Sequence, residues 1–152
     1  MAKGSRNRKP HRSKDDICRD VAYVLASPLT EGTKVAVLND ALWKWSEFDG
    51  KIDGCKWWSE AACAIRENRK QLIHEHLVPR KVLIERLLKL EEPGADKVAR
   101  IFQQCVGVVI TKDEDRLLNE HGLRSKMPKD CSEDDQWGRY RFTNIAVRDL
   151  SQ

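Results

Sequence analysis

The segment His74-Glu75-His76 places three ionisable side chains in a row between apolar pairs at positions 72–73 and 77–78. Ionisable groups buried without partners are strongly destabilising, so these three must be exposed, paired or bound to a metal ion. In an extended strand His74 and His76 share one face while Glu75 points to the other. A His pair at this spacing is able to chelate zinc, but the local spacing indicates no third ligand.

A second group of acidic side chains follows the apolar run Val106–Ile110. Thr111 with Glu114 three residues later forms a capping box, which predicts that a helix begins there. Acidic residues are favoured in a first helical turn because they face the positive end of the helix dipole. Stabilisation of the helix start therefore explains the three acids without any ligand, and binding of a metal ion is the alternative explanation for Asp113, Glu114 and Asp115.

The run Glu75-His76-Leu77-Val78-Pro79 resembles the acid–His–aliphatic–x–Pro signature that opens the HNH (ββα-metal) nuclease motif. The resemblance implies a strand, a loop, a second strand and a helix around one divalent metal ion, Mg²⁺, Mn²⁺ or Zn²⁺. It implies that His76 is the general base that activates water and that Glu75 is a metal ligand. Glu114 or Asp115 would stand where the family commonly has a further ligand. The intervening segment is longer than in the compact motif and lacks its central Asn.

Basic side chains near these two segments are candidates for contacts with nucleic-acid phosphates, because Lys and Arg make most such contacts. Four of them flank the predicted site and two alternate with aromatic residues in the patch Trp137–Phe142: Arg80, Lys81, Arg124, Lys126, Arg139 and Arg141. Alternation of Arg with aromatic residues is typical of nucleic-acid and protein-binding surfaces. The other tryptophans are interpreted as packing residues: Trp43, Trp45, Trp57 and Trp58.

The net charge of +4 is unevenly distributed along the 152 residues. Residues 1–14 carry six Lys and Arg and no acid, so the remainder has a charge of −2. We expect residues 1–14 to be a flexible basic arm that attracts nucleic acid, and residues 15–152 to be a single globular domain. No apolar run approaches the ~18 residues of a membrane span, and five widely spaced cysteines fit a reducing cytoplasm.

The hydrophobic pattern predicts an α+β fold that is mostly helical. Strands are expected at 72–78 and 106–110, and a helix at 112–121 should pack beside this two-stranded element in a ββα-metal-like arrangement. Further helices are expected near 13–27, 34–48, 59–70, 79–92 and 96–104. Residues 123–152 are expected to be irregular.

Two functions follow from these features. The first is an HNH-like metal-dependent phosphodiester hydrolase acting on DNA or RNA, or an inactive descendant of one. The alternative is a non-catalytic bacterial or phage protein of the accessory, inhibitor or immunity type, which recognises a protein or nucleic-acid partner. Proximity of His76 to Glu114 or Asp115 in the folded chain would favour the first.

Overall fold

The computed structural model describes residues 12–151, and its first helix begins at a capping box. The Ser13 hydroxyl accepts a hydrogen bond from the Asp16 N–H, and the Asp16 carboxylate accepts one from the Ser13 N–H. Lys14 is the first residue of this helix, and its Nζ lies 4.8 Å from the centre of the Trp45 ring. Ser13 and Lys14, the last two positions of the predicted arm, therefore belong to the start of α1, and positions 1–11 of that arm lie outside the described residues.

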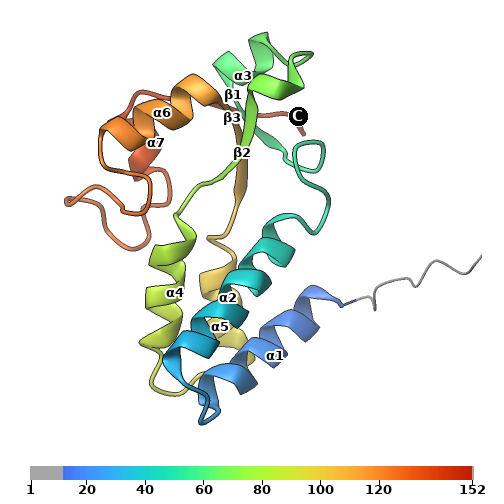
Figure 1. The fold of residues 1–152 in the computed structure, drawn as a ribbon, viewed down its shortest axis with the longest axis vertical. Helices are drawn as coiled ribbons and strands as arrows, with labels where there is room; N and C mark the ends of the chain where they lie inside the picture. Colours follow the sequence, from blue (N-terminus) through green and yellow to red (C-terminus); the bar gives the residue numbers. More distant parts are fainter. Residues whose placement is uncertain (1–11, 152) are drawn as a thin grey trace, which may run out of the picture.

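Seven α-helices and four strands are interspersed along the described residues (Figure 1). In order, the elements are α1 (Lys14–Ala26), α2 (Glu31–Ser46), β1 (Trp57–Ser59), α3 (Glu60–Ala64), the 3₁₀ turn η1 (Arg69–Gln71), β2 (Leu72–His76), α4 (Arg80–Leu88), α5 (Ala95–Phe102), β3 (Gly107–Thr111), α6 (Lys112–Glu120), α7 (Gly138–Phe142) and β4 (Val147–Asp149).

One half of the molecule is a group of helices, α1, α2, α4 and α5, which occupies the lower part of Figure 1. Apolar side chains at helical spacing meet in its core, among them Val21, Leu38, Leu83 and Phe102. Each of these is at most 2% exposed. Burial of this stripe from each helix is the main stabilising contribution in this half.

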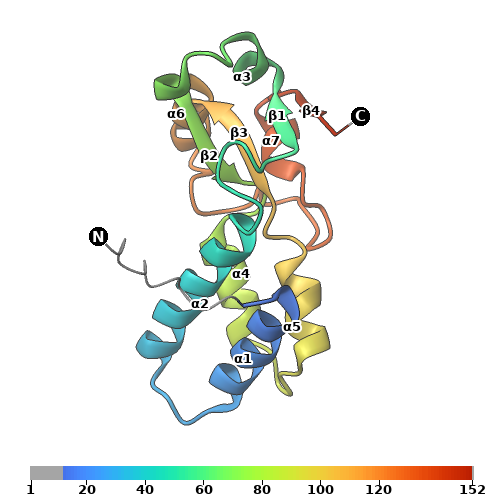
Figure 2. The same ribbon diagram turned by 90° about the vertical axis from the view of Figure 1, so that its right-hand side faces the viewer.

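The other half is built on a four-stranded sheet with the order β2-β3-β1-β4 (Figure 2). β2 and β3 are antiparallel, with His76 opposite Gly107 and Leu72 opposite Thr111. β1 runs parallel to β3 and antiparallel to β4. The predicted pairing of segment 72–78 with segment 106–110 is confirmed by β2 and β3. The sheet has four strands among the described residues and not two.

Side chains of β3 alternate between the two faces of the sheet. Val108 and Ile110 pack with Leu118 of α6 and Tyr140 of α7. Val109 packs on the opposite face with residues of β1 and α3. The prediction of a helix beside the two strands is therefore confirmed, and two helices, α4 and α5, separate β2 from β3 along the chain.

The expectation that residues 123–152 are irregular is wrong at α7 and at β4. A helix of five residues and a strand of three residues are too short to produce a hydrophobic period in the sequence. Both elements are held by tertiary contacts, since β4 pairs with β1 and α7 contributes the buried Tyr140. In residues 12–151 no helix has the length and apolar character needed to cross a bilayer.

Candidate functional site

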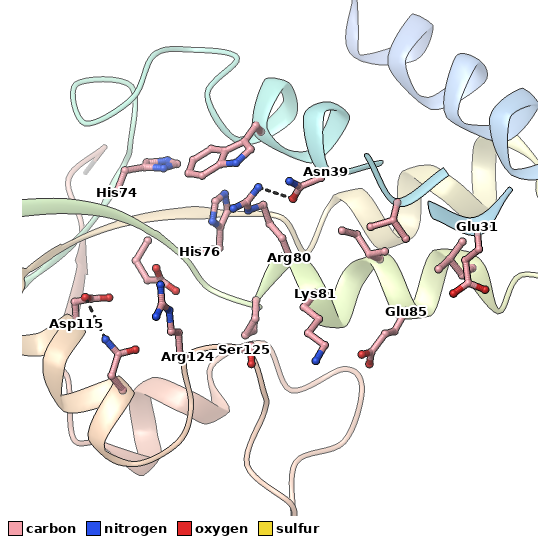
Figure 3. A pocket seen from close by; sticks show the side chains of 17 residues that line it. Glu31, Asn39, His74, His76, Arg80, Lys81, Glu85, Asp115, Arg124 and Ser125 are labelled. Carbon is pink, nitrogen blue, oxygen red and sulfur yellow. Dashed lines mark hydrogen bonds between the residues drawn. The ribbon is translucent and has the colours of Figure 1, made fainter. Parts of the chain in front are cut away.

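The carboxyl end of β2 opens into a cleft of about 930 Å³ between the two halves of the molecule. Figure 3 shows Asp115 and Arg124 on the opposite side of β2 from His74 and His76, so the cleft extends around the edge strand β2. Polar side chains from α2, β2, α4, α6 and the following segment line it: Glu31, Asn39, His74, Glu75, His76, Arg80, Lys81, Glu85, Asp115, Asn119, Arg124 and Ser125. His76, Glu75 and Asp115, three of the predicted site residues, therefore share one cleft.

His76 is the predicted general base, and it is 5% exposed at the base of this cleft. Its Nε2 lies 2.9 Å from the Ser46 hydroxyl, and its ring packs edge-on against Trp43 with the ring centres 4.8 Å apart. Burial, followed by the charge of His74, lowers the pKa of His76 to about 3. The imidazole is neutral at physiological pH, but a base this weak removes a proton from water far less readily than one with a pKa near 7.

His74 lies on the same face of β2, as predicted, with its ring centre 5.3 Å from that of His76. Both of its ring nitrogens are buried without a hydrogen-bond partner among the described residues. The ring sits against Gly107, where a Cβ would come within 2.3 Å of the His74 Nε2. Burial lowers the pKa of His74, so it too is neutral near pH 7.

Glu75 points to the other face of β2 and pairs with Arg139. The Arg139 guanidinium is fully buried and donates to the Glu75 carboxylate at 2.8 Å. It also donates to the backbone carbonyls of Leu77, Leu123 and His76. Arg139 thus has a structural position, tying β2 to α7 and to the end of α6, and lacks the surface exposure that its predicted phosphate contact requires.

Glu114 and Asp115 are adjacent in α6 but have different surroundings. The Glu114 carboxylate accepts hydrogen bonds from the Thr111 N–H at 2.9 Å and the Ser59 hydroxyl at 2.6 Å. It completes the predicted capping box, links α6 to β1, and does not line the cleft. Asp115 does line the cleft, and its carboxylate accepts a long hydrogen bond of 3.5 Å from the Asn119 amide.

Three of the predicted phosphate contacts, Arg80, Lys81 and Arg124, line the cleft. Within residues 12–151 none of the three forms an ion pair with an acidic side chain. The Arg80 guanidinium stacks on Trp43, 4.1 Å from its ring centre, and donates to Asn39 (Figure 3). Lys126 lies beyond this cleft, and so does Arg141, which pairs with Asp135.

The three predicted metal ligands, Glu75, Glu114 and Asp115, do not together form a site for a catalytic metal ion. A divalent cation on Glu75 would lie beside the buried charge of Arg139, and like charges at such short range repel strongly. Glu114 is engaged in the helix cap, which leaves Asp115 as the one predicted ligand in the cleft without an ion-pair or capping role. In the described part of the chain no group of three or more His, Cys, Asp and Glu side chains is arranged to hold a metal.

Three residues of this region were not anticipated as site residues. Ser46 and Trp43 come from the last turns of α2, and from the sequence Trp43 was interpreted as a packing residue. Tyr140 is buried beside α6, and its hydroxyl has no hydrogen-bond partner in residues 12–151. Burial, followed by the negative charge of Glu75, raises the pKa of Tyr140. No local pattern links these positions to β2, since the contacts are all long-range.

Comparison of the chain with protein-family models, with curated proteins and with solved structures gave no significant match. None of these comparisons supports the resemblance to the HNH family, which was drawn from the run Glu75–Pro79 of the sequence.

Proposed function

We propose that this protein binds a nucleic acid through the cleft at the end of β2 and that it does so without metal-dependent hydrolysis. In this proposal the chain is a binding protein that has the strand, strand, helix arrangement of a ββα-metal nuclease without its metal ligands. The observation that carries the proposal is the convergence of Arg80, Lys81 and Arg124, none of them in an ion pair, on one cleft. The cleft also holds acids: Glu75 is neutralised by Arg139, and the others are Glu31, Glu85 and Asp115.

Cations that lack an acidic partner are the groups best suited to bind phosphate, because no existing ion pair has to be broken. Arg80 is also held in place by its stacking on Trp43 and its bond to Asn39, which reduces the entropy lost on binding. Lys81 and Arg124 are exposed and approach the cleft from α4 and from the segment after α6. Lys and Arg contacts with phosphate oxygens fix the position of a nucleic-acid backbone on a protein.

Hydrolysis is disfavoured by the state of each predicted catalytic group. Glu75 is neutralised by Arg139, and Glu114 caps α6. His76 is buried against Ser46 and Trp43, and its burial makes it a weak base. The second candidate remains an HNH-like hydrolase, and the observation that favours it is that His76 and Asp115 line the same cleft. In that case His76 would accept a proton from water, and its replacement would abolish turnover.

Binding of labelled single- and double-stranded DNA and RNA oligonucleotides, followed by fluorescence anisotropy, tests the proposal. The variant Lys81→Gln/Arg124→Gln should bind more weakly, and the slope of log K against log salt should fall by about 0.7 to 0.9 for each lost phosphate contact. The matched control Lys70→Gln/Lys112→Gln removes the same charge from exposed positions outside the cleft and should change binding little. Equal losses in both variants, or no binding by the wild type, would contradict the proposal.

A further inference from the structure

The cleft continues into two further hollows along α4 and the segment after α6. The first, of about 430 Å³, shares Lys81, Glu85 and Ser125 with the cleft. The second, of about 660 Å³, shares Lys126 and Met127 with the first. The three hollows therefore follow one another along the surface from β2 to α7, and we refer to this row as the groove.

The middle of this groove is its most basic part. Four cations line it, Lys81, Arg86, Lys89 and Lys126, against the two acids Glu85 and Glu133. In the described residues none of the four cations is in an ion pair, and the three lysines are exposed. Lys81 lies in the first turn of α4 and Lys89 at its C-cap, so cations from both ends of this helix line the middle hollow.

The far end of the groove presents an exposed aromatic ring. Phe142 is 58% exposed, and its ring packs edge-on against His121 with the ring centres 5.6 Å apart. Both residues line the last hollow. An exposed phenyl ring beside a basic groove provides a stacking surface for a nucleic-acid base. The bases of a duplex are already stacked on one another, so such a surface selects a single strand.

We propose that the groove is a track for single-stranded nucleic acid, in which Lys89 and Lys126 bind backbone phosphates and Phe142 stacks on a base. This proposal rests on the function proposed above and extends it from a phosphate-binding cleft to a strand several nucleotides long. The strand would run from Arg124 in the cleft, past Lys126, to Phe142. The affinity of the protein for a single strand should therefore increase with the length of the strand.

The test is fluorescence anisotropy with labelled oligothymidylates of about 4, 8 and 16 nucleotides, which cover the usual range of single-strand site sizes. A duplex of the longest sequence is measured beside them. Affinity should rise with length in the wild type, and the duplex should bind more weakly than the single strand. Lys89→Gln/Lys126→Gln should remove most of the gain with length while binding of the shortest oligonucleotide is retained. The charge-matched control is Lys70→Gln/Lys112→Gln.

The base-stacking contact is tested separately by Phe142→Ala. Loss of one stacked base should weaken binding of the longest oligonucleotide about tenfold. Tyr23→Ala is the control, because Tyr23 is 72% exposed on α1, outside the groove. Affinity that is independent of length but still requires Lys81 and Arg124 would overturn the track and leave the cleft proposal intact. Tighter binding of the duplex would also overturn the track, and no binding of any probe would overturn both proposals.

Discussion

Replacing Glu75 with Gln removes the anion that neutralises the buried guanidinium of Arg139. Removing one partner of a fully buried ion pair costs about 3–5 kcal/mol. The side chain of Glu75 is 21% exposed, so water screens part of the interaction, and the carbonyl bonds of Arg139 persist. We therefore expect Glu75→Gln to lower the free energy of unfolding by about 1–3 kcal/mol.

Urea denaturation followed by circular dichroism measures this loss. Glu85→Gln is the matched control, because Glu85 lines the same cleft and forms no ion pair in the described residues. This substitution should change the free energy of unfolding by no more than about 0.5 kcal/mol. Titration of both variants with Mg²⁺ and Mn²⁺ should give the same result as the wild type. Unchanged stability of Glu75→Gln together with weaker metal binding would refute the assignment of Glu75 as a structural residue and restore it as a metal ligand.

Three further predictions follow from the same contacts. Because the pKa of His76 is lowered to about 3 in the folded chain, the unfolded chain binds the proton more tightly. The contribution of His76 to stability is therefore complete above about pH 6.5, and between about pH 6.5 and pH 3 it falls by up to about 1.4 kcal/mol for each pH unit. Urea unfolding at several pH values should show that His76→Gln flattens this part of the pH–stability curve. Glu114→Ala should cost about 1–2 kcal/mol in thermal or urea unfolding through loss of the helix cap, whereas Asp113→Ala, at an exposed position in the same turn, should cost less than half as much. Gly107→Ala should lower stability by about 1–3 kcal/mol in the same assay, because the new methyl group would press on His74, and an unchanged unfolding midpoint would contradict this packing.

The elements that could be predicted from the sequence are those with strong local signals. The capping boxes at Ser13 and Thr111 determine where α1 and α6 begin, and the β-branched run before Thr111 indicates β3. The short elements β1, α7 and β4 have no such signals, because they exist through pairing and burial contributed by distant segments. The resulting error was to treat α7 and β4 as part of an irregular segment.

The sequence indicated several of the side chains that line the cleft, but it did not indicate the contacts among them. His76, Asp115 and three of the predicted cations do line one cleft, since β2, α4 and α6 meet there. The pairing of Glu75 with Arg139 joins residues 64 positions apart, and no pattern of spacing indicates it. The same holds for the contact between His76 and Ser46. Whether a polar side chain binds a ligand or stabilises the fold depends on such long-range partners.

The most direct test of the central claim is a single experiment on the wild-type protein with labelled single-stranded DNA and RNA, in Mg²⁺, Mn²⁺ or Zn²⁺ and in excess EDTA. Anisotropy and denaturing gels would be recorded on the same samples. We predict equal binding with and without metal, and intact oligonucleotides throughout. Cleavage that requires a divalent metal and disappears in His76→Ala would contradict the account and establish the hydrolase.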